Sequence, residues 1–300
     1  MVGGRVDDAL AWERLATNLR VERELLEVLD ALAPLHVAVF KGGLLTRRLY
    51  GDLAARASAD NDLAVRRGDA AAALERLLQR GYRALPGLDP RRALTRTGQV
   101  ALFPEGDVAA VSLDLHVEPF SRNFFAVDEQ TIWSRLEEVE LHGRRVWTFD
   151  ASLTLCHMVA HFVQHLLEAE QLRHIGRAWA AWGHTLDPAA LRGLAARTCS
   201  VEGLEYALGL AEQLGHTEGR AVTVTTARAR WALRRFPAGS LLRLRSSVRG
   251  LLAVLVVGPG RLPRALRRGF LPEGDELEAL YGAGRGVGAL WKHWRHRLLD

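Results

Sequence analysis

The sequence predicts an α+β protein, in which an N-terminal mixed sheet with flanking helices is followed by an all-helical C-terminal domain. Up to about residue 150, short segments with strand character alternate with helical segments. From Ala151 onward, helical periodicity dominates and strand candidates are rare. We therefore expect two domains, over residues 1–150 and 151–300.

The first predicted elements are a helix, a strand and a second helix. Leucines recur at helical spacing over residues 10–32, and Pro34 ends that helix. Residues 35–40 are short and apolar with two valines, which is typical of a strand. Lys41-Gly42-Gly43 follows directly, and helical character returns over residues 44–50. This succession would direct the N–H groups of a helix start toward a ligand above the turn.

The next strand candidates place acidic side chains on one face. Over residues 60–65, alternation puts Asp60 and Asp62 on the same face. Over residues 108–117, Asp114 and His116 share a polar face, while apolar residues form the other. We expect both segments to belong to one sheet.

The remaining elements follow from the same patterns. Before residue 150 we expect a helix over residues 70–80 that begins at Asp69, and strands over residues 100–103 and 144–149. Beyond it we expect helices near residues 151–170, 172–182, 188–197, 202–214, 219–235 and 241–257. Pro259, Pro263 and Pro272 break the chain that follows into short segments.

Composition limits the class of protein. Three hundred residues that are 48% hydrophobic and 25% charged are sufficient to bury a core. The longest apolar run, near residues 251–257, is far shorter than the roughly 20 residues of a membrane span. The N-terminus carries acids where a secretory signal would carry a basic region. We expect a cytoplasmic protein with no membrane span.

Lysine is nearly absent from this basic chain. Of 40 Lys and Arg residues, only Lys41 and Lys292 are lysines. A lysine beside two glycines indicates a compact ammonium at a phosphate, where a guanidinium would not fit. Chance retention is the alternative. The many arginines beyond residue 240 fit solvated helix faces better than a nucleic-acid surface.

Asp60, Asp62 and Asp114 are the predicted metal ligands and catalytic residues. Two carboxylates on one strand face repel each other, and a divalent cation relieves that repulsion. Asp114 would add oxygen ligands or accept the proton of an attacking hydroxyl. One or two Mg²⁺ ions held there would bridge nucleotide phosphates during an in-line displacement. Taken alone, Asp-x-Asp is also typical of a solvated strand face.

The order of these motifs resembles the nucleotidyltransferase fold shared by DNA polymerase beta and many small nucleotidyltransferases. Their pattern is Gly-Gly after a strand, then Asp-x-Asp, then a third acid in an apolar strand. Over about residues 10–215 the chain more closely resembles a bacterial family of uncharacterised nucleotidyltransferases. The matching motifs are Phe40-Lys41-Gly42-Gly43, Tyr50, Arg56, Asp60-Asn61-Asp62-Leu63-Ala64-Val65 and Leu113-Asp114-Leu115-His116, followed by His157, His161 and His165.

The resemblance implies a nucleotidyltransferase catalytic domain over residues 1–150 and a helical substrate or acceptor domain over residues 151–300. It implies Mg²⁺-dependent transfer of a nucleoside monophosphate from an NTP, such as ATP, to a small-molecule or peptide acceptor, with release of pyrophosphate. The nucleotide-binding residues would be Lys41, Gly42, Gly43, Arg56 and His116. The alternative is an inactive module of the same fold that binds a peptide, RNA or a partner protein.

Two further features bear on the site. Asn61 stands where the family usually has a hydrophobic residue, so we expect the other face of that strand to be partly exposed. His157, His161 and His165 form one stripe on a helix. Without a nearby cysteine or a His-Glu-x-x-His pattern, the stripe fits a helix that lines a cleft better than a zinc site.

Overall fold

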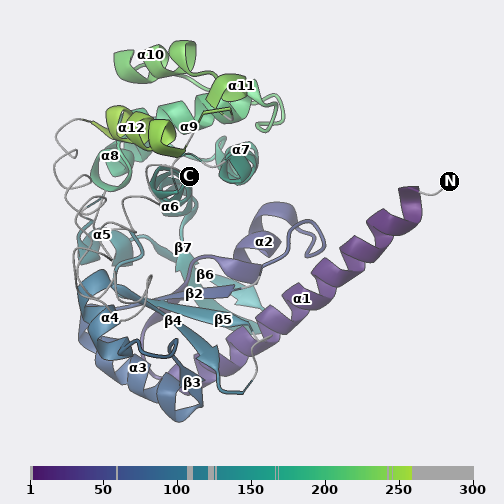
Figure 1. Cartoon of the computed structure of the whole chain (residues 1–300), viewed down its shortest axis with the longest axis vertical. Helices are drawn as coiled ribbons and strands as arrows, with labels where there is room; N and C mark the ends of the chain where they lie inside the picture. The colour runs from purple at the N-terminus through teal and green to yellow at the C-terminus, as the bar shows by residue number, and fades with distance from the viewer. Residues whose placement is uncertain are drawn as a thin grey trace. The chain divides into compact units, whose positions relative to one another are not determined.

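The computed structural model describes residues 3–258, except residues 59, 107–110, 121–124, 126, 166, 168, 242 and 245. The chain divides into two compact units, whose helices and strands are labelled in Figure 1. Unit 1 comprises residues up to 119 together with 128–150, and unit 2 comprises residues 120–127 together with those from 151 onward. The predicted segments around Pro259, Pro263 and Pro272 lie outside the described residues.

Unit 1 is built on a mixed sheet whose strands are ordered β3-β4-β5-β2-β1-β7-β6 in the described chain. Two pairs, β2 with β5 and β1 with β7, are parallel, and the other neighbouring pairs are antiparallel. The strands are β1 (Val37–Val39), β2 (Asp60–Val65), β3 (Tyr82–Arg83), β4 (Gln99–Pro104), β5 (Ser112–His116), β6 (Leu136–Leu141) and β7 (Arg144–Phe149). The helices are α1 (Gly3–Leu32), α2 (Gly42–Tyr50), the 3-10 turn η1 (Arg67–Asp69), α3 (Ala70–Gln79), α4 (Pro90–Thr97) and α5 (Glu129–Trp133).

The core of unit 1 lies on one face of the sheet, where α1, α3 and α4 pack (Figure 1). Leu63 and Val65 of β2 and Leu113 and Leu115 of β5 point into this core. Because side chains alternate along a strand, the acids between them lie on the opposite face. The predicted separation of apolar and polar faces is therefore confirmed for both strands.

Asn61 corrects one expectation. Its face of β2 is not exposed, because α1 covers it and leaves only 1% of Asn61 accessible. The Nδ2 atom of Asn61 donates a hydrogen bond to the main-chain oxygen of Val21 on α1, at 3.1 Å. A polar side chain is tolerated in this core because a helix carbonyl supplies a partner.

Unit 2, as far as it is described, is helical. Its helices are α6 (Ala151–Gln164), α7 (Ala169–Trp182), α8 (Pro188–Thr198), α9 (Val201–Gln213), α10 (Ala227–Arg235), α11 (Ala238–Leu241) and α12 (Ser246–Val257). Side chains are buried around the whole circumference of α9 from Gly203 to Ala211, so it forms the centre of this unit. Cys156 and Cys199 are buried free thiols.

Several predicted helix ends in unit 2 are wrong for local reasons. The first helix stops at Gln164, and Leu167 then adopts a left-handed conformation with φ of 65°. The helix expected from residue 219 begins only at Ala227, because the Glu205 carboxylate accepts hydrogen bonds from the main-chain N–H groups of Thr225 and Thr226. No helix in the described part of the chain is both long and apolar enough to cross a membrane.

Candidate metal centre

The candidate site is built on the parallel pairing of β2 with β5. In this register Asp62 lies opposite Asp114, Ala64 opposite His116, and Asp60 opposite Ser112. All of these side chains emerge on the face away from the α1, α3 and α4 core. Residues about fifty positions apart are thus brought side by side by main-chain pairing alone.

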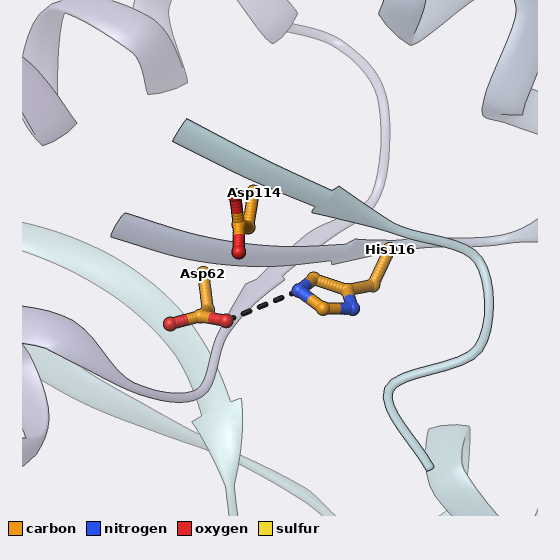
Figure 2. A group of neighbouring side chains, drawn as sticks. All are labelled: Asp62, Asp114 and His116. Atoms are coloured by element: carbon orange, nitrogen blue, oxygen red, sulfur yellow. Dashed lines mark hydrogen bonds and ion pairs between the residues drawn. The ribbon is translucent and has the colours of Figure 1, made fainter. Parts of the chain in front are cut away.

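Asp62, Asp114 and His116 form a group in which one ligand atom of each lies within 4.8 Å of the others. Figure 2 shows the two carboxylates and the imidazole turned toward one another. The Nε2 atom of His116 is 3.1 Å from Oδ1 of Asp62. Within the described residues, no other group of three histidines, cysteines or acids converges in this way.

Lys41 reaches the same carboxylate from the strand-to-helix turn. Its Nζ atom is 3.4 Å from Oδ1 of Asp62 and 5.8 Å from the centroid of the Phe40 ring. The Asp62 side chain is only 1% exposed, whereas the Lys41 side chain is 23% exposed. A buried carboxylate is costly unless it is paired, and this ammonium provides the compensating charge.

Aromatic rings position the imidazole of His116. The Phe40 ring meets it edge to face with centroids 5.1 Å apart, and Phe40 stacks on Phe149 at 4.9 Å. The main-chain N–H of Phe40 donates to the carbonyl oxygen of Asp62 at 3.2 Å. Phe40, directly after β1, therefore packs against the His116 ring and also holds the main chain at Asp62.

The electrostatics of the face favour an added cation. Burial, reinforced by the charge of Asp62, raises the pKa of the Asp60 carboxyl, and Lys41 and Arg56 oppose this shift only in part. Burial and Asp62 also raise the pKa of the Asp114 carboxyl. Crowded, partly desolvated carboxylates of this kind are relieved by a bound cation.

The residues present fit a divalent cation. Two carboxylates and an imidazole are donor types that such ions accept in proteins. The Nδ1 atom of His116 is buried and has no hydrogen-bond partner among the described residues. Asp60 lies on the same face but outside the group of three, so its predicted role as a ligand stays a prediction.

Gly42 allows α2 to begin directly against β2. It has φ of 73°, and a Cβ atom placed on it would lie 2.7 Å from the main-chain oxygen of Asp60. Gly43 is similarly close to α1, since its Cβ would lie 3.1 Å from Cγ of Glu22. The glycine pair predicted from sequence thus has a steric role, and its predicted contact with phosphate is not tested by the fold.

Asn18 of α1 was not predicted to serve the site, yet it holds the segment that leads into β2. Its Oδ1 atom accepts a hydrogen bond from the main-chain N–H of Ser58 at 2.9 Å. Its Nδ2 atom donates to the main-chain oxygens of Leu53 and Arg56. The sequence did contain a signal, because Asn18 occupies the helical stripe that continues through Val21 and Leu25 into the core.

The Arg56 side chain points to hydroxyl groups beside β2. Its Nη1 atom is 3.4 Å from Oγ of Ser58 and 3.4 Å from Oγ1 of Thr46. Its charge also acts on Asp60, whose pKa it lowers in opposition to burial. The predicted residue therefore lies near the acids, while phosphate binding by it remains a prediction.

Glu22 ties α1 to α2 beneath the glycine turn. The Arg47 guanidinium donates from Nε and Nη2 to the two oxygens of Glu22, at 2.9 and 2.8 Å. Burial alone would raise the pKa of Glu22, but hydrogen bonds from Arg47 and His142 hold it below its usual value. This ion pair fixes the helix that follows Lys41.

The predicted histidine stripe lies in unit 2, with His157 and His161 on α6 and His165 directly after its end. The rings of His157 and His161 are 6.2 Å apart and those of His161 and His165 are stacked at 4.1 Å. Phe120, from the same unit, meets the His157 ring edge to face at 5.2 Å. In the described residues the stripe does not form a group suited to a metal ion.

A family model described as uncharacterised nucleotidyltransferase matches residues 11–216. The matched segment contains Asn18, the glycine turn, and the acids and histidine of β2 and β5. No curated protein gives a significant match. No solved structure gives one either.

Proposed function

We propose that this chain, which belongs to the uncharacterised nucleotidyltransferase family, transfers a nucleoside monophosphate from an NTP to a small-molecule or peptide acceptor. The observation that supports this most is the in-register pairing of Asp62 with Asp114, with His116 two residues further along β5. Family membership supports nucleotidyl transfer in general, and the nature of the acceptor is the more specific part of the proposal.

The proposed reaction is an in-line displacement. An oxygen or nitrogen of the acceptor attacks the α-phosphorus of the NTP, and the bond from that phosphorus to the oxygen bridging to the β-phosphorus breaks. Pyrophosphate leaves with the bonding electron pair, and the acceptor's proton passes to Asp114. Asp114 lies opposite Asp62 in the pairing of β2 with β5, and this position beside the proposed metal site supports the role.

Asp62, Asp114 and His116 would hold a divalent cation, for which the sequence predicts Mg²⁺, with Asp60 adding a further carboxylate. When bound, such a cation neutralises charge on the phosphates and on the departing pyrophosphate. The resemblance to the polymerase-beta-like superfamily supports the same assignment of Asp60, Asp62 and Asp114 as metal-binding and catalytic residues.

Lys41 and the beginning of α2 would bind the phosphates. The partly exposed ammonium of Lys41 is already beside Asp62, and it occupies the N-cap position of α2 without capping the helix through its side chain. The first N–H groups of the helix, at Gly42 and Gly43, carry partial positive charge that favours an anion. We assign Arg56 to the outer phosphates.

Transfer of label from an NTP tests the proposal. Full-length protein, Mg²⁺ and NTPs labelled at the α-phosphate are incubated with peptide and small-molecule fractions of a cell extract. We expect labelled product and pyrophosphate from the wild type and from Asp69→Asn, a control beside β2, and neither from Asp62→Asn. Equal labelling by Asp62→Asn would refute the assignment. Calorimetry that showed peptide or RNA binding without NTP binding would favour an inactive binding module.

A further inference from the structure

His116 stands closer to the metal centre than its predicted role in nucleotide binding requires. Its Nε2 atom, and not its Nδ1 atom, faces the carboxylates, at 3.1 Å from Oδ1 of Asp62 (Figure 2). The ring is 5% exposed and is held by the edge-to-face contact with Phe40. A nitrogen donor is thus fixed in place beside two oxygen donors.

The spacing of these atoms matches that of ligands on a common ion. Nitrogen and oxygen donors lie about 2.0–2.2 Å from a small divalent cation, so two ligands separated by an angle of about 90–110° at the ion are about 2.8–3.6 Å apart. The 3.1 Å between His116 and Asp62 falls within this interval. An ion can therefore bind His116 and Asp62 together at their present separation.

The tautomer of His116 is also free to suit a metal ion. A ligating Nε2 must be unprotonated, with the ring proton on Nδ1, and a partner on Nδ1 usually fixes the tautomer. Among the described residues, Nδ1 has no such partner. Moving the proton to Nδ1 gives up the Nε2–H hydrogen bond to Oδ1 of Asp62, and an ion bound between those two atoms replaces it.

From this geometry we propose that His116 is a metal ligand and that the site prefers a first-row transition-metal dication, such as Mn²⁺, over Mg²⁺. This inference rests on the proposed function only because both concern the same metal site. Mg²⁺ favours oxygen ligands and water, whereas imidazole nitrogen is a favourable ligand for transition metals. A site of two carboxylates and one imidazole differs in this respect from the three aspartates expected from sequence.

The bound ion can be observed without turnover. Mn²⁺ is titrated into the full-length protein in the absence of nucleotide, free Mn²⁺ is followed by electron paramagnetic resonance, and Mg²⁺ affinity is obtained by competition. Electron spin echo modulation of bound Mn²⁺ detects a directly coordinated nitrogen-14 nucleus. We expect one bound Mn²⁺ with nitrogen coupling in the wild type, and loss of binding in Asp62→Asn.

Replacement of His116 is compared with replacement of a histidine from the stripe in unit 2. His116→Gln should abolish the nitrogen coupling and reduce the ratio of Mn²⁺ to Mg²⁺ affinity by on the order of tenfold or more. Replacing a residue that only hydrogen-bonds to a metal ligand already lowers metal affinity by about tenfold or more. His165→Gln, at an exposed position, should change neither quantity. If His116→Gln fails to fold, nitrogen coupling in the His161→Gln/His165→Gln double variant still supports the assignment.

Bound Mn²⁺ without nitrogen coupling, or coupling that persists in folded His116→Gln, would overturn the inference. So would an equal loss of Mn²⁺ and Mg²⁺ affinity in that variant. These outcomes are separable from failure of the proposed function. Nitrogen-coupled Mn²⁺ in a protein that transfers no nucleotide would refute only the transferase, whereas transfer without nitrogen coupling would refute only the role of His116.

Discussion

Gly42 approaches β2 so closely that a Cβ atom on it would lie 2.7 Å from the main-chain oxygen of Asp60. At the other end of α2, Gly51 has a similar φ, 67° against 73° for Gly42, but a Cβ there would meet no atom of the described residues within 4 Å. Comparing alanine variants at these two positions therefore distinguishes the free-energy cost of a left-handed backbone from the cost of a steric clash with β2.

Alanine at Gly42 should destabilise the protein more than alanine at Gly51. Both variants incur about 1–2 kcal/mol from a left-handed conformation, and Gly42→Ala incurs a further ~1–3 kcal/mol from the overpacked contact. The free energy of unfolding in urea measures the difference. Equal losses in the two variants would show that β2 moves aside without cost.

Neutralising Asp114 should stabilise the protein near neutral pH. The pKa of the Asp114 carboxyl in the folded protein is raised above the ordinary value of 3.8, so the folded state binds this proton more tightly than the unfolded chain does. The resulting contribution to the free energy of unfolding is complete below pH 3.8 and is lost as the pH rises through the raised pKa. Asp114→Asn should therefore melt a few degrees higher than the wild type at pH 7. The gain should vanish below pH 3.8, where the wild-type carboxyl is also neutral.

The matched control is Asp69→Asn, which removes the same charge outside the group of acids. Its melting temperature should follow that of the wild type at both pH values. Mn²⁺ or Mg²⁺ should reverse the order at pH 7, since the ion stabilises only a folded state that binds it. A wild type that is more stable than Asp114→Asn at pH 7 without metal would contradict the prediction.

Exchanging lysine for arginine at position 41 should impair transfer although it keeps the charge. The Lys41 ammonium fits between the Phe40 ring and Asp62 as a compact group, and a planar guanidinium requires more space and different hydrogen bonds. We expect Lys41→Arg to lower kcat/KM by about 10- to 100-fold, that is about 1.4–2.7 kcal/mol of transition-state stabilisation. Lys292→Arg, at the only other lysine, should match the wild type.

Removing the amide of Asn18 should destabilise unit 1 and loosen the segment that enters β2. Asn18→Ala removes the partner of the Ser58 N–H and of two carbonyls, one buried and one partly buried, which costs about 2–4 kcal/mol in unfolding free energy. Arg23→Ala, on the exposed side of the same helix, should cost about 0.5 kcal/mol or less. Rapid hydrogen exchange at Ser58 in Asn18→Ala alone would support the stated cause, and unchanged exchange would contradict it.

The elements that depend on local alternation were predictable. The bounds of β2 and β7 agree with the expected strands, because apolar and polar residues alternate along each of them. β6 was not predicted, since Leu136–Leu141 carries three glutamates and owes its strand conformation to pairing with β7. Edge strands of this kind depend on tertiary pairing more than on their own composition.

The arrangement of the site was predictable only in part. Alternation showed that Asp60 and Asp62 share a face, but it does not determine which acid lies opposite Asp114. That choice depends on the register between β2 and β5, a long-range property, and the register selects Asp62. The same register places His116 near the Asp62 carboxylate, while its expected contact with the nucleotide stays a prediction.

The pairing of β2 with β5 also bears on how related sequences can diverge. Inserting one residue between Asp114 and His116 would turn one of these side chains into the core, because successive residues of a strand point to opposite faces. Added residues in the connections before and after these strands would leave the pairing of Asp62 with Asp114 unchanged. Natural variation in length should therefore accumulate in the connections, while the two-residue interval from Asp114 to His116 stays constant.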